Sequence, residues 1–225
     1  MKTEMLYRPS YTLTRVLLEP GETINVEGGS MVSMGKNIGI ETKARGGIFS
    51  ALKRSVLGGE SFFINTYKSS QSEGEITLAP PLPGDMCVQE LKNETLLVQS
   101  GSFVAASEGI DIDTKWTGAK TFFASEGLIM LKLSGSGTLI LSSFGAIHEI
   151  NLDAGQVYTI DTGHLVAFTE GIGFDVRRVG GIKSTLFSGE GLVVDLTGPG
   201  KVLMQTRSED SFLSWLIPRI PKREH

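Results

Sequence analysis

Three stretches of the sequence share one pattern of glycine and apolar residues. Each reads Gly-x-apolar-Val, then five residues, then Ile-x-apolar, and the copies begin at Gly29, Gly101 and Gly163. Because matches at five positions in three places are not expected by chance, we interpret the stretches as an internal repeat. The spacing of these anchor glycines gives a unit of about 60–70 residues, which is the size of a small sheet of five or six strands.

The segments that follow the anchors also agree with one another. In every copy an acidic residue precedes a strongly apolar stretch, and these residues are Glu60, Glu126 and Glu190. We interpret them as turn residues that accept hydrogen bonds from free backbone amides. A glycine turn and a further strand close each unit, and we expect that turn at Ser134–Gly137 in the second copy. The chain is then one domain with repeats at about 10–80, 81–145 and 146–207, and a C-terminal helix and tail at 208–225.

The distribution of glycine indicates an all-β fold. The chain contains 28 glycines in 225 residues, well above the usual share of about 7%. They separate short Val, Ile, Leu and Phe runs, a pattern typical of many short strands joined by tight turns. The run Leu128–Leu133 is almost continuously apolar and is expected to be buried on both faces, as in the core of a sandwich or a closed barrel.

Two segments have helical rather than strand patterns. Ile48–Leu57 contains no turn residue and lies between two glycine pairs, so it predicts a short helix inserted in the first repeat only. Ser211–Ile217 predicts a second short helix that ends at Pro218. If exposed, either apolar segment could contact a partner or a membrane, and if buried it would cap one end of the β core. The candidate contact residues are Ile48, Phe49, Leu52, Lys53, Arg54, Phe212, Trp215 and Leu216.

Several motifs together resemble one known family. They are Gly180–Leu192 (GGIKSTLFSGEGL), Leu196–Gly200 (LTGPG), Gln205–Ser208 (QTRS) and Trp215–Pro218 (WLIP), with Gly59–Tyr67 (GESFFINTY) earlier in the chain. They are similar to the altered-inheritance-of-mitochondria biogenesis family, in its bacterial and archaeal branch of unknown function. The resemblance covers about Met1 to Pro221. It implies a fold like that of the tryptophan RNA-binding attenuation protein, with three β units packed around a pseudo-threefold axis as one sandwich-like or barrel-like body. It implies no catalytic residues.

Charge and composition disfavour several classes of protein. The net charge of −4 gives no basic footprint for nucleic acid. The chain has two basic clusters, one of Lys43, Arg45, Lys53 and Arg54 and one of Arg177, Arg178 and Lys183, and neither is flanked by suitable exposed aromatic residues. The start of the chain lacks the apolar core of a signal peptide. No apolar run approaches the roughly 18 residues of a membrane span. We therefore expect a cytoplasmic protein that binds no nucleic acid.

The sequence offers few candidates for catalysis or metal binding. Cys87 is the only cysteine, and the histidines are His148, His164 and His225. A Cys87 nucleophile paired with His148 or His164 would make a hydrolase, but a lone cysteine between Met86 and Val88 is more often a small buried apolar residue. A metal site needs three or four converging ligands, and the spacing indicates none. We expect no catalytic residue, no metal and no cofactor.

These observations favour a non-enzymatic β scaffold that forms a homo-oligomer or docks a protein partner. A small-ligand or RNA-binding module like the attenuation protein is the second hypothesis. A metal-dependent or Cys-based hydrolase is the third. Peripheral membrane contact through the apolar segments is an alternative to a protein partner.

Overall fold

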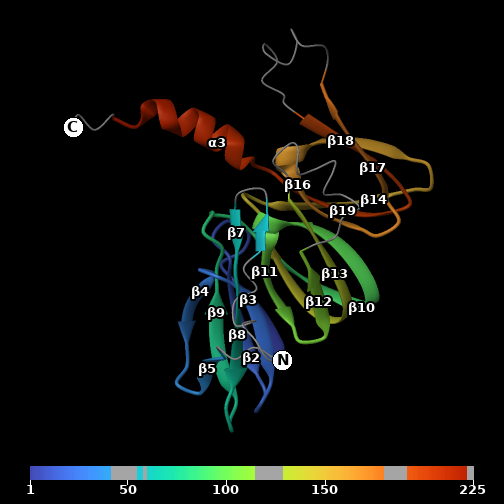
Figure 1. Cartoon of the computed structure of the whole chain (residues 1–225). Coiled ribbons are helices and arrows are strands. Elements are labelled where there is room, and N and C mark those ends of the chain that lie inside the picture. The colour runs from blue at the N-terminus through green and yellow to red at the C-terminus, as the bar shows by residue number, and fades with distance from the viewer. Residues whose placement is uncertain (42–54, 58–59, 115–128, 180–191, 222–225) are drawn as a thin grey trace.

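The computed structural model describes residues 1–41, 55–57, 60–114, 129–179 and 192–221 (Figure 1). The first part of the chain forms β1 (Lys2–Leu6), β2 (Leu13–Leu18), β3 (Thr23–Glu27), β4 (Met31–Met34), β5 (Ile38–Glu41), β6 (Ser55–Leu57), β7 (Glu60–Phe62), β8 (Ile64–Ser69) and β9 (Gly74–Leu78). The middle part forms β10 (Met86–Gln99), the 3₁₀ turn η1 (Ser100–Ser102), β11 (Phe103–Ser107), β12 (Ile110–Asp113) and β13 (Met130–Ser142). The last part forms β14 (Ile147–Leu152), β15 (Val157–Asp161), η3 (Thr162–His164), β16 (Leu165–Thr169), β17 (Gly173–Arg178), β18 (Leu192–Thr197), β19 (Gly200–Gln205), α3 (Glu209–Leu216) and η4 (Ile217–Arg219). The expected all-β fold is confirmed.

The strands form open antiparallel sheets. One sheet has the order β1-β2-β9-β4, and a ten-stranded sheet has the order β14-β19-β16-β10-β13-β11-β3-β8-β5, with β12 also paired to β13. Among the described residues there are also a three-stranded sheet, β15-β18-β17, and a two-stranded sheet, β6-β7. None of these sheets closes into a barrel, so the sandwich alternative holds rather than the barrel.

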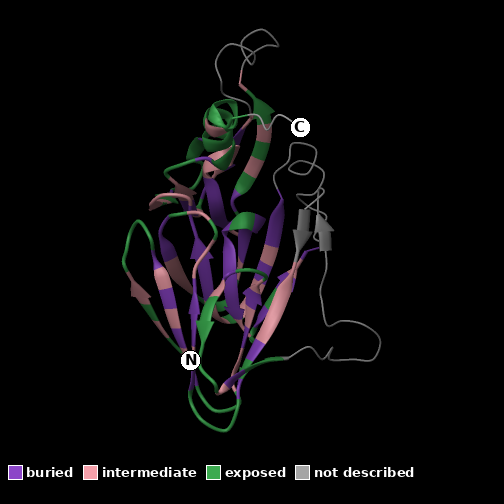
Figure 2. Ribbon diagram, turned by 90° about the vertical axis from the view of Figure 1, so that its left-hand side faces the viewer, coloured by how far each residue is buried: buried purple, intermediate pink, exposed green. Residues whose placement is uncertain are grey.

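Alternating burial along the strands produces the core. In β2, Val16 and Leu18 are fully buried while the residues between them are half-buried, as expected for a strand with one face on a core. The four-stranded sheet packs on β3, β8 and β11, and the three-stranded sheet packs on β14, β16 and β19. A third cluster, which includes Phe103 and Leu131, lies between them. Figure 2 shows this buried interior running along the strands of the body.

A buried carboxylate ties the N-terminal hairpin to β10. Asp85, whose side chain is only 5% exposed, accepts two hydrogen bonds from the Arg8 guanidinium, from Nε at 2.9 Å and from Nη2 at 2.8 Å. The Thr12 hydroxyl and the Met86 amide also donate to Asp85 Oδ1, each at 2.9 Å. Burial raises the pKa of Asp85, but the hydrogen bonds from Arg8, Thr12 and Met86 and the charge of Arg8 outweigh it, so the pKa lies below its usual value.

The helix expected over Ile48–Leu57 is wrong where the structure describes it. Ser55–Leu57 is strand β6, paired with β7, whereas Ile48, Phe49, Leu52, Lys53 and Arg54 lie outside the described residues. Helical periodicity in a short apolar run is a weak signal, and pairing with a neighbouring segment overrides it. The C-terminal helix is confirmed, although it begins at Glu209, two residues before the expected start, and continues through Pro218 as η4.

The turn expected at Ser134–Gly137 is also wrong. These residues lie inside β13, where they pair with β10 and, in part, with β12. Gly135 and Gly137 have φ of +128° and +150°, and a Cβ at either position would collide with residues of the β11–β12 segment. The glycines are therefore required for close backbone approach within a long bent strand rather than for a reversal of the chain.

Candidate functional site

The anchor glycines lie in three tight turns at the ends of β3, of β10 and of β15. In each turn the last residue of the preceding strand accepts a hydrogen bond from the turn itself. Glu27 accepts from the Ser30 hydroxyl at 3.4 Å, Gln99 from the Ser102 hydroxyl at 3.2 Å, and Asp161 from the Gly163 amide at 2.8 Å. In all three segments, a hydrogen bond from the turn to the last residue of the preceding strand thus stabilises the passage from one strand to the next. The division of the chain into repeats stays a prediction.

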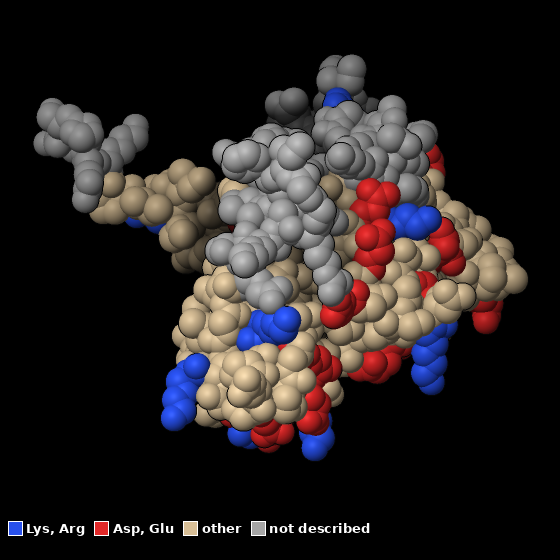
Figure 3. Space-filling model, turned by 60° about the horizontal axis from the view of Figure 1, so that its bottom comes forward, with Lys and Arg blue, Asp and Glu red and all other residues tan. Residues whose placement is uncertain are grey.

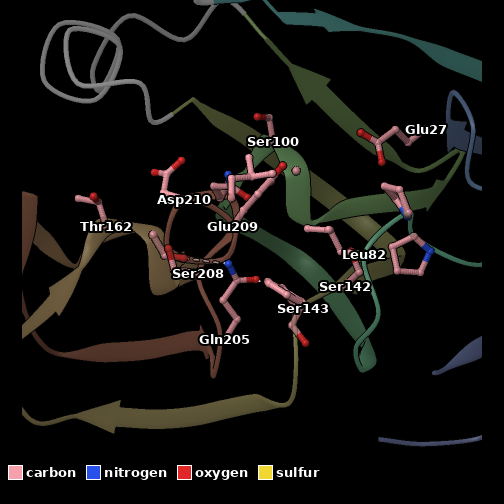
Figure 4. Close-up of a pocket in the computed structure, with 17 residues that line it drawn as sticks. Glu27, Leu82, Ser100, Ser142, Ser143, Thr162, Gln205, Ser208, Glu209 and Asp210 are labelled. Atoms are coloured by element: carbon pink, nitrogen blue, oxygen red, sulfur yellow. Dashed lines mark hydrogen bonds between the residues drawn. The ribbon is translucent and has the colours of Figure 1, made fainter. Parts of the chain in front are cut away.

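Residues of these three turns line one cavity of about 500 Å³, within the range of small-ligand sites. Figure 4 shows Glu27 on one side, Asp210 and Thr162 on the other, and Ser100 between them. The lining consists of Glu27, Pro80, Pro81, Leu82, Gln99, Ser100, Gly101, Ser142, Ser143, Phe144, Thr162, Gly163, Gln205, Ser208, Glu209, Asp210 and Leu213. Two of the anchors, Gly101 and Gly163, are therefore part of a candidate binding site, whereas Gly29 is not among its lining residues.

The polar character of this cavity follows from its lining. Every charged residue among the described lining residues is acidic, namely Glu27, Glu209 and Asp210. Ser100 is 8% exposed and Ser142 is 3% exposed. Within the described residues the Oγ atoms of both serines lack a hydrogen-bond partner, and neither atom is sealed off from solvent. Leu82, Phe144 and the two prolines give the remaining wall an apolar surface.

Helix α3 begins at the edge of the cavity and is firmly attached there. Ser208 is buried and caps the helix by accepting a hydrogen bond from the Ser211 amide at 3.4 Å. The Gln205 side chain donates to the Gly163 carbonyl at 2.9 Å and accepts from the Phe144 amide at 2.8 Å. The segment that leads into α3 is therefore held to the body by these hydrogen bonds.

Beyond its first turn α3 projects away from the body (Figure 1), and no residue of the helix is buried. Trp215 is 55% exposed and Ile217 is 62% exposed. The aromatic rings contact one another along the helix: Phe144 meets Phe212 edge-on at 5.5 Å, and Phe212 stacks on Trp215 at 6.4 Å. We call the residues Phe212, Leu213, Trp215, Leu216, Ile217 and Ile220 the apolar stripe. Isolated helices shorter than about 12–15 residues are marginal in water, and α3 has eight residues.

The candidates for catalysis are not brought together into a site. Burial raises the pKa of the Cys87 thiol, which is the opposite of what a nucleophilic thiolate needs. His164 shares a hydrogen bond of 2.7 Å between Nδ1 and the Gln205 carbonyl, and His148 is exposed on β14. No group of three or more His, Cys, Asp or Glu side chains suited to a metal occurs in the part of the chain that the structure describes.

The remaining sequence-predicted residues divide into two groups. Phe212, Trp215 and Leu216 lie on α3, as expected, and Glu60 begins strand β7. Glu126 and Glu190 lie outside the described residues. Sequence reasoning missed the cavity residues Glu27, Ser100 and Ser142, although two of them directly precede an anchor turn or an anchor glycine.

The surface and the helices add two observations. Acidic and basic side chains are interspersed over the face that Figure 3 shows, without an extended basic stripe. Among the described residues, no helix combines the length and apolarity required to cross a bilayer.

The fold and the site describe a multi-sheet antiparallel β protein with a polar cavity at its strand-end turns and a protruding C-terminal helix. The sequence profile of the family described as Mitochondrial biogenesis AIM24 matches residues 3–207, so the chain belongs to that family. It is 31% identical over 219 residues to an uncharacterised protein of Streptococcus pyogenes serotype M6, covering 94% of this chain and 88% of that protein.

A solved structure has the same fold. The X-ray crystal structure of a Streptococcus pyogenes protein superposes with a TM-score of 0.80 at 28% identity, covering 97% of this chain and 99% of that one. These comparisons confirm the family expected from the sequence. The descriptions of both streptococcal proteins name no activity.

Proposed function

We propose that this protein is a non-enzymatic β scaffold that self-associates through α3. The observation that supports this most directly is the apolar stripe on a short helix that is attached at its base and exposed over the rest of its length. Burial of a large apolar side chain contributes about 1.5–3 kcal/mol. A side chain that is half exposed can therefore contribute roughly half of that free energy when a partner covers it.

The order of residues along α3 favours a second copy of the same helix as the covering surface. The acidic residues Glu209 and Asp210 occupy the first turn, whereas Arg219 lies at the far end. Two such helices packed antiparallel around Ser214 bring Leu213 of one copy opposite Trp215 of the other, and place Glu209 near Arg219 of the second copy. This arrangement is self-complementary, as a twofold interface must be.

The size of the interface sets the expected strength. A pair of short helices buries much less than the roughly 800 Å² per partner of a standard interface, so we expect a reversible dimer with Kd on the order of 10–100 µM. Sedimentation analysis or light scattering of the full chain across this range is the test. Replacement of Leu216 and Ile217 by Ser should leave a monomer, because the centre of the apolar stripe is lost.

Two controls make this test specific. The double variant Val157→Ser/Tyr158→Ser removes two exposed apolar side chains from β15 and should still dimerise. Glu209→Lys and Arg219→Glu should each weaken the dimer, and the two together should restore it, because the ion pair is rebuilt with reversed signs. A wild-type chain that stays monomeric throughout the range refutes the proposal. If that monomer sediments with anionic vesicles, membrane contact replaces self-association as the role of α3.

The attenuation-protein-like fold and the associated RNA-binding hypothesis stay predictions. Superposing the three thirds of the chain on one another would test the first. Salt-dependent retention of single-stranded RNA would test the second.

A further inference from the structure

Strand β15 is an end strand of the three-stranded sheet β15-β18-β17. Its register with β18 is continuous from Val157 to Asp161. Among the described residues, β18 is the one strand that pairs with β15. Alternate backbone N–H and C=O groups of β15 therefore point away from the sheet, where a further strand could bond them.

The first three side chains of β15 are exposed, and two of them are large and apolar. Val157 is 58% exposed and Tyr158 is 40% exposed, and Thr159 follows them on the surface. Because successive side chains of a strand point to opposite faces, apolar surface is uncovered on both faces of this edge. The edge thus combines unpaired backbone groups with apolar side chains that water covers poorly.

Other end strands of this protein are protected against pairing, whereas β15 is not. Charged side chains and bulges are the usual protection of a sheet edge. The end strands β1 and β14 carry exposed charges, among them Glu4 and Glu149, and a bulge interrupts the register of β4. From Val157 to Ile160, β15 has no charge, no proline and no bulge. Asp161 at its end already accepts a hydrogen bond from the Gly163 amide.

The sequence of β15, Val-Tyr-Thr-Ile-Asp, is complementary to itself when two copies run antiparallel. With Thr159 on the twofold axis, all five residues overlap, and Tyr158 of one copy lies opposite Ile160 of the other. An aromatic residue opposite a β-branched residue is a favourable cross-strand pair. No like charges face each other in this register, and the backbone groups of both edges gain partners.

We therefore propose that the edge of β15 is a second interface, at which it pairs antiparallel with β15 of another copy of this chain. The two three-stranded sheets then form one sheet of six strands. This interface lies apart from the apolar stripe, so a chain that uses both joins α3 dimers into a larger assembly. A contact of five residues per copy is far smaller than a standard interface, so we expect a Kd on the order of 1 mM.

Disulfide trapping tests this register in the full chain carrying Leu216→Ser/Ile217→Ser, in which α3 cannot contribute. Thr159→Cys places two thiols opposite each other, at a Cα separation of about 4.5–5.5 Å that a disulfide can bridge. In a glutathione redox buffer, this variant should form disulfide-linked dimers at least tenfold faster than Glu149→Cys, which places a thiol on the end strand β14. The parent chain without an added cysteine corrects for Cys87.

A charge on the edge should prevent the pairing. Tyr158→Lys removes the contact with Ile160 of the other copy, so trapping through Thr159→Cys should fall to the level of Glu149→Cys. Tyr11→Lys, which changes a tyrosine that is 74% exposed outside β15, is the matched control and should leave trapping unchanged. Equal trapping at positions 159 and 149, or equal trapping with and without Tyr158→Lys, overturns the proposal.

Hydrogen exchange tests the same interface without any substitution in β15. In the Leu216→Ser/Ile217→Ser chain, the amides of β15 should exchange more slowly as the protein concentration is raised through the expected Kd, whereas those of the end strand β1 should not change. Exchange in β15 that is independent of concentration overturns the proposal. Because α3 is disabled in both experiments, their outcomes do not depend on whether α3 forms a dimer.

Discussion

Replacing Asp85 by Asn should destabilise the fold far more than replacing a carboxylate of similar geometry on the surface. The substitution keeps the shape of the side chain but removes the charge that accepts four hydrogen bonds from Arg8, Thr12 and Met86. It also places an amide NH₂ against donors of Arg8. Removing one partner of a buried ion pair typically costs about 3–5 kcal/mol.

The lower end of that range applies here, because the Arg8 side chain is 51% exposed and can recover water when its partner is lost. We therefore expect a loss of about 3 kcal/mol in the free energy of unfolding, or roughly 6–12 °C in Tm for a chain of this size. Thermal unfolding at pH 7 is the assay. Glu75→Gln is the control, because Glu75 pairs with Arg15 at 2.6 Å while both side chains are about 40% exposed. An exposed pair of this kind contributes about 0–1 kcal/mol.

The same pair predicts a pH dependence. Because the pKa of Asp85 is lowered in the folded state, its contribution is complete above the unfolded value of about 3.9. It is lost as the pH falls through the lower folded value. The difference in Tm between wild type and Asp85→Asn should thus be constant from pH 7 to pH 5 and shrink below about pH 4. A variant that melts within 1 °C of wild type at pH 7, or a difference that does not shrink in acid, would refute the role assigned to Asp85.

Two further predictions concern the anchors and the cysteine. A Cβ at Gly163 would lie 2.6 Å from Ser208 Oγ, so Gly163→Ala should displace the cap of α3 and cost about 1 kcal/mol; Gly39→Ala, where the added methyl meets nothing within 4 Å, is the control in the same unfolding assay. Because burial raises the pKa of Cys87, its alkylation by iodoacetamide at pH 7 should be at least tenfold slower than that of a free cysteine, and it should accelerate with pH beyond the range in which a free thiol saturates. Alkylation at the free-thiol rate would contradict that assignment and reopen a nucleophilic role.

Much of the strand structure is determined by local sequence. In β12, Ile110 and Ile112 are buried while Asp111 between them is exposed, as strict alternation predicts. The all-β fold class was also predictable from local sequence, because the many glycines separate short apolar runs as turns separate strands. The C-terminal helix was predictable because Phe212, Trp215 and Leu216 follow helical spacing and Ser208 is a good capping residue.

Other features depend on contacts between distant segments. Glycines at positions 135 and 137 are equally compatible with a turn and with a bent strand, so the local sequence does not distinguish the two structures. The β11–β12 segment packs so closely against these glycines that only a strand without side chains fits there. The segment ending at Leu57 had a helical pattern, yet pairing with β7 makes it a strand. A few residues of periodicity cannot outweigh a hydrogen-bonded neighbour.

The sequence by itself determined the all-β class, most of the strands and the apolar C-terminal helix, because each depends on residues adjacent in the chain. Only the tertiary structure decided that the turns meet. Glu27, Ser100, Ser142 and Asp210 are far apart in sequence and carry no pattern that links them, yet they surround one cavity. The turns meet because the ten-stranded sheet joins all three parts of the chain through backbone hydrogen bonds, which are available to every residue type and leave little trace in the sequence.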